Sequence, residues 1–170
     1  GTSYKGSLVG VDAYRLAEIA MGAAVSRSGI DPALIEDCAM GESMQGGGNI
    51  ARHAAILLGL NNVPGVATQR WCASGMAAVH YIAANISAGM IDCGIAGGSE
   101  SMSTAPATQK PGLEGVPTMW LPAANPETEL TPAFNMALTV GENTARIAGV
   151  TREESDEWAY QSHLNAIRAI

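Results

Sequence analysis

Residues 69–76 read QRWCASGM and decide the fold, because they join a short extended run to a long apolar segment. The run from Val66 to Trp71 is predicted as a strand, and the segment from Ala73 to Ala88 as a helix with almost no polar face. A helix that is apolar all round is usually buried on all sides. The stretch therefore predicts a strand, a turn that carries Cys72, and a buried helix.

Cys72 is the candidate nucleophile of this chain. A thiol in the first turn of a helix faces unpaired backbone N–H groups and the positive end of the helix dipole, and both stabilise a thiolate. A thiolate is a soft nucleophile suited to thioesters and other activated acyl groups. The small residues Ala73, Ser74 and Gly75 leave room for a substrate carbonyl. From the local pattern alone, an inert cysteine at a buried helix start is an equally good interpretation.

The sequence offers no partner base for this nucleophile. The three histidines are His53, His80 and His163, and no spacing places any of them beside Cys72. A packed or surface role is therefore the favoured interpretation of each histidine.

Helices and strands alternate around this stretch. Periodicity and glycine stops predict helices from Asp12 to Gly29 and from Ile50 to Leu58, and strands around 38–40 and 92–98. Such alternation indicates an α/β fold. Cys38 and Cys93 lie in the strand-like runs and are predicted as small buried residues.

The pattern changes near residue 104. Residues 104–132 hold six of the eight prolines and are predicted as a long excursion from the core. Two helices follow: one at 136–148, and one from Thr151, where Glu154 completes a capping box. The last helix has no stop signal, so the chain looks cut at Ile170.

Composition excludes several classes of protein. The net charge is −7 and the nine Lys and Arg residues are scattered, which argues against a nucleic-acid partner. No apolar run is long enough to span a membrane, and no targeting segment is visible. Three cysteines without metal-site spacing predict no metal and a cytoplasmic or other reducing compartment. The glycine-rich residues 41–49 lack the Gly-Lys-Ser/Thr of a phosphate loop.

Four collinear motifs resemble the thiolase family: residues 69–78, 96–103, 49–55 and 141–157. The resemblance implies a layered α/β fold, with a mixed sheet around a buried helix. It implies an N-terminal core at 1–103, without its first strand, and a truncated loop domain at 104–170. By motif match, Cys72 is the residue that forms the acyl thioester, and its backbone N–H contributes to an oxyanion hole.

The same resemblance implies acyl transfer between CoA thioesters, as in fatty acid and lipid metabolism. The reaction is thiolytic cleavage of a 3-ketoacyl-CoA or the reverse Claisen condensation, with coenzyme A as co-substrate and no permanently bound cofactor. It also implies a homodimer or homotetramer. The length of the substrate's acyl chain stays open, as does the choice between a fatty acyl and a steroid substrate.

The chain departs from the family pattern in two ways. Gln69 stands where thiolases commonly have asparagine, which puts the local packing in doubt. The histidine and second-cysteine motifs of the family's second half have no counterpart here, so this chain is not expected to complete the catalytic cycle alone. A β-ketoacyl synthase relative and a non-catalytic thiolase-like subunit or binding module remain alternatives.

Overall fold

A computed structural model describes residues 6–45, 47–112, 115–120, 123 and 125–170. The chain forms two compact units, one ending at Thr108 and the other running from Gln109 to Ile170. The domain boundary expected between residues 103 and 104 lies five residues before this division. Within the described residues, no helix combines the length and apolar character needed to cross a membrane.

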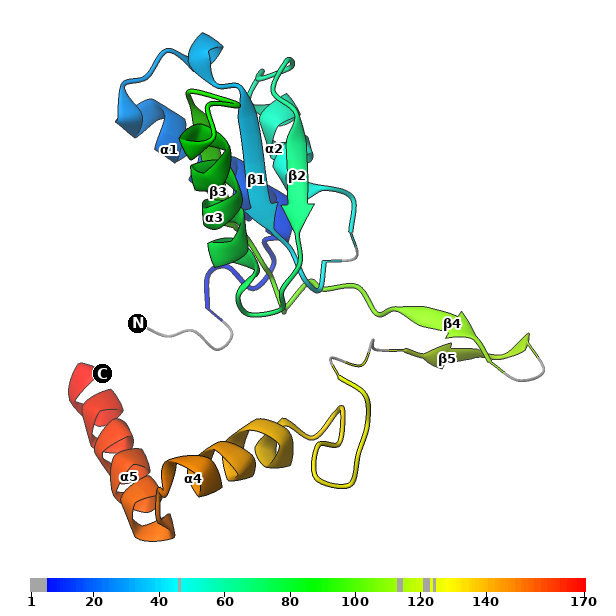
Figure 1. Cartoon of the computed structure of the whole chain (residues 1–170), viewed down its shortest axis with the longest axis vertical. Coiled ribbons are helices and arrows are strands. Elements are labelled where there is room, and N and C mark those ends of the chain that lie inside the picture. The colour runs from blue at the N-terminus through cyan, green and yellow to red at the C-terminus, as the bar shows by residue number, and fades with distance from the viewer. Residues whose placement is uncertain (1–5, 46, 113–114, 121–122, 124) are drawn as a thin grey trace. The chain divides into compact units, whose positions relative to one another are not determined.

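The first unit is built on a three-stranded sheet in the order β2-β1-β3 (Figure 1). Its strands are β1 (Asp37–Gly41), β2 (Gly65–Thr68) and β3 (Gly94–Gly98). Both neighbours pair with β1 in parallel, and Ala39 lies opposite Val66 on one side and Ala96 on the other. The expected α/β class is confirmed. The antiparallel pair that a mixed sheet implies is not found among the described strands of this sheet.

Helices cover both faces of the sheet, and successive side chains of β1 point to opposite faces. Cys38 and Met40 are buried in a cluster with α1 (Ala13–Ser28) and α2 (Ile50–Leu57). Ala39 points to the other face and packs with Ala78 and Ile82 of α3 (Ser74–Ser87). The sheet therefore lies between α1 and α2 on one face and α3 on the other.

The predicted helix bounds hold for α1. The Asp12 side chain caps its start by accepting from the Arg15 N–H, and Gly29 ends it in the left-handed conformation.

The prediction that α3 is buried on all sides is wrong for this chain. Only Ser74, Ala78 and Ile82 are buried along the helix, while the Met76 side chain is 60% exposed and Val79 43%. The reason is geometric: α3 packs one face on the sheet, and no described element of this unit packs on its opposite face. Its all-round apolar sequence thus leaves an apolar surface.

Glycines let the start of α3 lie directly on the sheet. A Cβ on Gly41, the last residue of β1, would collide with the backbone of Ser74 and Gly75. A Cβ on Gly98, at the end of β3, would stand 3.2 Å from the Gly75 Cα. These close approaches hold the turn before α3 next to the ends of β1 and β3.

The described part of the second unit begins with a hairpin that was not predicted from the sequence. Strands β4 (Gln109–Pro111) and β5 (Pro117–Met119) pair antiparallel within the segment expected to be irregular. The helix predicted at 136–148 is present as a π-helical segment, η3 (Ala137–Glu142), followed by α4 (Asn143–Ala148).

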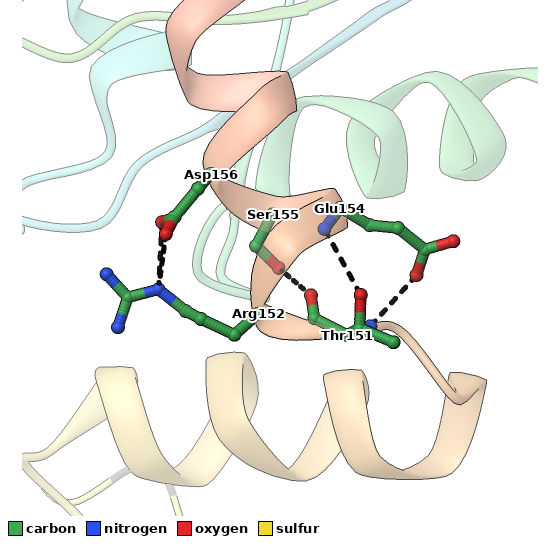
Figure 2. A network of polar contacts seen from close by, with 5 residues as sticks. All are labelled: Thr151, Arg152, Glu154, Ser155 and Asp156. Atoms are coloured by element: carbon green, nitrogen blue, oxygen red, sulfur yellow. Dashed lines mark hydrogen bonds and ion pairs between the residues drawn. The ribbon is translucent and has the colours of Figure 1, made fainter.

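The last helix, α5 (Arg152–Ala169), begins with the predicted capping box (Figure 2). The Thr151 hydroxyl accepts from the Glu154 N–H at 3.2 Å, and the Glu154 carboxylate accepts from the Thr151 N–H at 2.9 Å. Arg152 and Asp156 add an exposed ion pair one turn on, at 2.8 Å. This part of the prediction is confirmed.

Candidate active site

The three parallel strands end at the same edge of the sheet, and the segments that follow them line one cavity. Its volume is about 710 Å³. Its walls come from the ends of β1 and β3, the segments that follow the three strands, and the first turns of α3: residues 41–44, 71–72, 74–76, 79, 97–100 and 102. The chain passes from β1 to β2 on one side and then crosses back past β1 to β3. Ligands of α/β sheets bind outside the carboxyl ends of strands at such a switch point.

Cys72 lies on the wall of this cavity and is exposed. The sequence predicts this residue in the first turn of the helix. The structure instead starts α3 at Ser74, with Ala73 as the N-cap residue, so Cys72 immediately precedes the cap. The sulfur is thus carried by the turn that leads into the helix.

The start of α3 has no side-chain cap, because Ala73 carries no hydrogen-bonding group. By contrast, Asp12, Asn49 and Thr151 each accept a backbone N–H at the starts of α1, α2 and α5. The Ser74 N–H donates to the Trp71 carbonyl at 3.0 Å, and the N-cap residue supplies no side chain to the N–H groups that follow it. Such N–H groups are suited to a developing oxyanion.

Trp71, directly before the cysteine, has a φ of 50° in the left-handed region. This conformation is unusual for a bulky residue. Gln69 supports it, because its side-chain oxygen accepts the Trp71 N–H at 2.8 Å. The glutamine that departs from the family pattern therefore makes a local turn-stabilising bond with its own longer side chain.

Glu100 ties two walls of the cavity together. Its Oε2 accepts backbone N–H bonds from Ser43 at 3.1 Å and Met44 at 2.7 Å. Its Oε1 and the Gln45 Nε2 are buried without a hydrogen-bond partner among the described residues. The segment resembling the thiolase motif thus fixes the loop after β1.

The hydroxyls on either side of Glu100 anchor the same segment to the start of α1. Ser99 donates to the Ala13 carbonyl at 2.9 Å, and Ser101 donates to the Val11 carbonyl at 2.8 Å.

Glu42 is a cavity residue that was not predicted from the sequence. It follows β1, lines the cavity, and its carboxylate accepts the Ile50 N–H at the start of α2 at 2.9 Å. The signal that could have found it is its place directly after a predicted strand, because parallel strands bring their carboxyl ends together.

Neither histidine of the first unit lines this cavity. His53 is on α2, where its ring stands 4.6 Å from the Tyr14 ring. His80 lines a separate hollow beside Arg70. His163 belongs to α5, in the second unit. The structure therefore brings neither His53 nor His80 to the wall that holds Cys72.

The other two cysteines differ from Cys72 in burial. Cys38 is fully buried in β1, and its thiol donates to the Pro64 carbonyl at 3.2 Å. Burial, helped by the Asp37 carboxylate and opposed by Arg52, raises the pKa of the Cys38 thiol to about 11. Cys93 is half-buried just before β3, rather than inside the predicted strand. No group of three or more His, Cys, Asp or Glu side chains suited to a metal ion occurs in the part of the chain that the structure describes.

Comparison with known proteins places these features in a family. Residues 1–170 match the family model of the thiolase N-terminal domain. A 3-ketoacyl-CoA thiolase of Bacillus subtilis is 35% identical over 176 residues, covering 100% of this chain and 42% of that protein. An acetyl-CoA acetyltransferase of Pseudomonas aeruginosa is 34% identical, covering 99% of this chain and 44% of that protein.

A solved structure agrees with these matches. The crystal structure of the Bacillus anthracis acetyl-CoA acetyltransferase has a TM-score of 0.73 and 30% identity, over 96% of this chain and 43% of that chain. The chain thus spans about two fifths of the length of the curated relatives described above. On the family-model match across its full length, the chain belongs to the thiolase family.

Proposed function

We propose that the full-length protein carrying this chain transfers acyl groups between CoA thioesters through an acyl-cysteine at Cys72. The reaction is thiolytic cleavage of a 3-ketoacyl-CoA or the reverse Claisen condensation. One observation carries the proposal: Cys72 is exposed on the wall of the cavity at the carboxyl ends of the parallel strands. Relatives named 3-ketoacyl-CoA thiolase and acetyl-CoA acetyltransferase support this class of reaction.

The proposed chemistry has two steps. In the condensation direction, the Cys72 sulfur attacks the acyl carbonyl of an acyl-CoA. A new thioester forms, and coenzyme A leaves as a thiol with the proton that the cysteine gives up. A base of the full-length protein then takes an α-proton from a second acyl-CoA, and the resulting carbanion attacks the acyl-cysteine. The carbon–carbon bond forms as the thioester bond breaks, and the Cys72 thiolate that leaves takes up the proton. Thiolysis is the reverse of both steps.

The cavity walls suit a thioester with an apolar acyl group. Met44, Met76, Val79 and Met102 line the cavity. An apolar surface holds an acyl chain by burial, while the uncapped start of α3 offers polar backbone groups to the carbonyl oxygen. We assign the Cys72 backbone N–H to this oxyanion hole as part of the proposal.

Coenzyme A acts in this scheme as a co-substrate, with no permanently bound cofactor. We also propose a homodimer or homotetramer, supported by the exposed apolar side chains of α3. Light scattering on the full-length protein checks the assembly. A cytoplasmic or other reducing compartment is our proposal for its location, supported by three free cysteines.

The test is a thiolysis assay with acetoacetyl-CoA and coenzyme A. In the full-length protein, Cys72→Ala is expected to lose essentially all activity, whereas Cys93→Ala retains it. A wild-type protein that is folded but cleaves none of the acyl-CoA substrates offered would instead favour a non-catalytic thiolase-like subunit.

A further inference from the structure

We propose that Ser74 is a positioning residue, whose hydroxyl holds the backbone before Cys72 in its left-handed turn. The inference rests on the proposed role of Cys72 and adds a residue through which that role depends on the turn. Ser74 is 5% exposed. Its Oγ donates to the Trp71 carbonyl at 2.6 Å and accepts the Arg70 N–H at 2.8 Å.

These bonds bracket the cysteine. The backbone of Ser74 follows Cys72, while both partners of its hydroxyl precede Cys72. A serine at a helix start commonly caps N–H groups further along the helix. The Ser74 hydroxyl instead reaches back across the turn.

We call the two hydrogen bonds of the Ser74 hydroxyl, to the Trp71 carbonyl and from the Arg70 N–H, the Ser74 clamp. The backbone of Ser74 is held as well, because the Thr68 hydroxyl at the end of β2 donates to the Ser74 carbonyl at 2.9 Å. The serine is thus tied to the strand as well as to the turn.

The clamp acts on a residue with a strained backbone. Trp71 has a φ of 50°, which a side chain with a Cβ disfavours. Its carbonyl accepts from both the Ser74 hydroxyl and the Ser74 N–H, the latter at 3.0 Å, and its own N–H donates to Gln69. If Trp71 relaxed to negative φ, the peptide joining it to Cys72 would rotate and carry the sulfur away from its place on the cavity wall.

This geometry predicts a specific kinetic effect. Ser74→Ala in the full-length protein is expected to lower kcat about 10- to 100-fold, because a displaced nucleophile reacts slowly, while KM changes less than about 3-fold. The control is Ser87→Ala on the same helix, which removes an exposed hydroxyl bonded to Ala83 and is expected to leave kcat unchanged.

A double-mutant cycle separates positioning from a general structural role. Glycine populates positive φ about as readily as negative φ, so Trp71→Gly relieves the strain against which the Ser74 hydroxyl acts. In that background, Ser74→Ala is expected to cost less than about 3-fold in kcat relative to Trp71→Gly alone. Equal losses in both backgrounds would overturn the proposal.

Gln69→Ala gives a second route if Ser74→Ala fails to fold. Gln69 is exposed and supports the same residue from its N–H side. Gln69→Ala is expected to lower kcat in the protein with Trp71, and to have little effect on kcat in the Trp71→Gly variant. Equal effects in the two backgrounds would contradict the clamp.

The Cys72 alkylation rate with iodoacetamide, with Cys93 as internal reference, is measured in the same variants. This readout does not depend on thiolase activity. An inactive wild-type protein overturns the proposed function, and the alkylation cycle still decides the clamp. An active wild-type protein with wild-type kcat in Ser74→Ala overturns only the clamp.

Discussion

The Glu100 carboxylate accepts the Met44 backbone N–H at 2.7 Å and thereby joins the segment after β3 to the loop after β1. Both residues line the cavity that holds Cys72. The cavity wall is therefore fixed by a hydrogen bond between residues 56 positions apart in the chain.

We expect Glu100→Ala to lower the free energy of unfolding by about 2 kcal/mol, because two backbone N–H groups lose a charged acceptor. Glu100→Gln keeps an acceptor oxygen and is expected to lose less. Urea unfolding measures both variants. Exposed Glu129 is the control, and Glu129→Ala should change stability by less than about 0.5 kcal/mol. Equal effects at the two positions would show that the wall does not depend on Glu100.

Gly41→Ala is expected to destabilise the protein by about 1 to 3 kcal/mol and to lower activity, because its new methyl group would collide with the backbone at the start of α3. Gly97→Ala is the matched control, since a Cβ at this position on the same cavity wall meets nothing within 4 Å. Thermal unfolding and the thiolysis assay compare the pair. A Gly41→Ala protein as stable as Gly97→Ala would contradict the close packing described.

Alkaline pH should destabilise the folded state through Cys38. Burial raises the pKa of this thiol to about 11 from an ordinary value near 9. Below pH 9 both states hold the proton and the contribution is fully present. As pH rises from 9 to 11, the unfolded state loses its proton while the folded state keeps it, so stability falls by about 1.4 kcal/mol per pH unit.

Urea unfolding from pH 8 to 11 tests this slope against Cys38→Ala. The alanine variant starts less stable because it leaves a small cavity, but it should lack the slope due to the thiol. Parallel pH profiles of the two proteins would rule out a raised pKa at Cys38.

Burial also predicts the order in which the cysteines react. N-ethylmaleimide should modify exposed Cys72 first and half-buried Cys93 more slowly. Cys38 should react only on unfolding, because it is fully buried. Peptide mapping by mass spectrometry over time gives the order. Modification of Cys38 as fast as Cys72 in the folded protein would contradict the structure.

The elements that the sequence predicted well are those fixed by local chemistry. Asp12 and Gly29 bound α1 because a cap and a left-handed glycine act within one turn. Thr151 and Glu154 start α5 for the same reason.

The hairpin of β4 and β5 had no comparable signal. All six of its strand residues are exposed. A strand with no buried face needs no alternation of apolar and polar residues, so the sequence carries no such pattern here.

The candidate site could be predicted only in part. Cys72 was identified from its neighbours in the chain, and its catalytic role remains a prediction. Glu42 and the contact of Glu100 with Met44 were missed, because they depend on the strand order of the sheet. The exposure of α3 was missed because an apolar helix sequence does not specify what packs against each face.

The most direct test of the central claim is mass spectrometry of the full-length protein after incubation with acetyl-CoA and acid quenching. We predict one acetyl group, located by peptide mapping on Cys72, retained in Cys93→Ser and absent from Cys72→Ala. An acetyl group on another residue, or an unmodified Cys72 in a protein that cleaves acetoacetyl-CoA, would contradict the acyl-cysteine account.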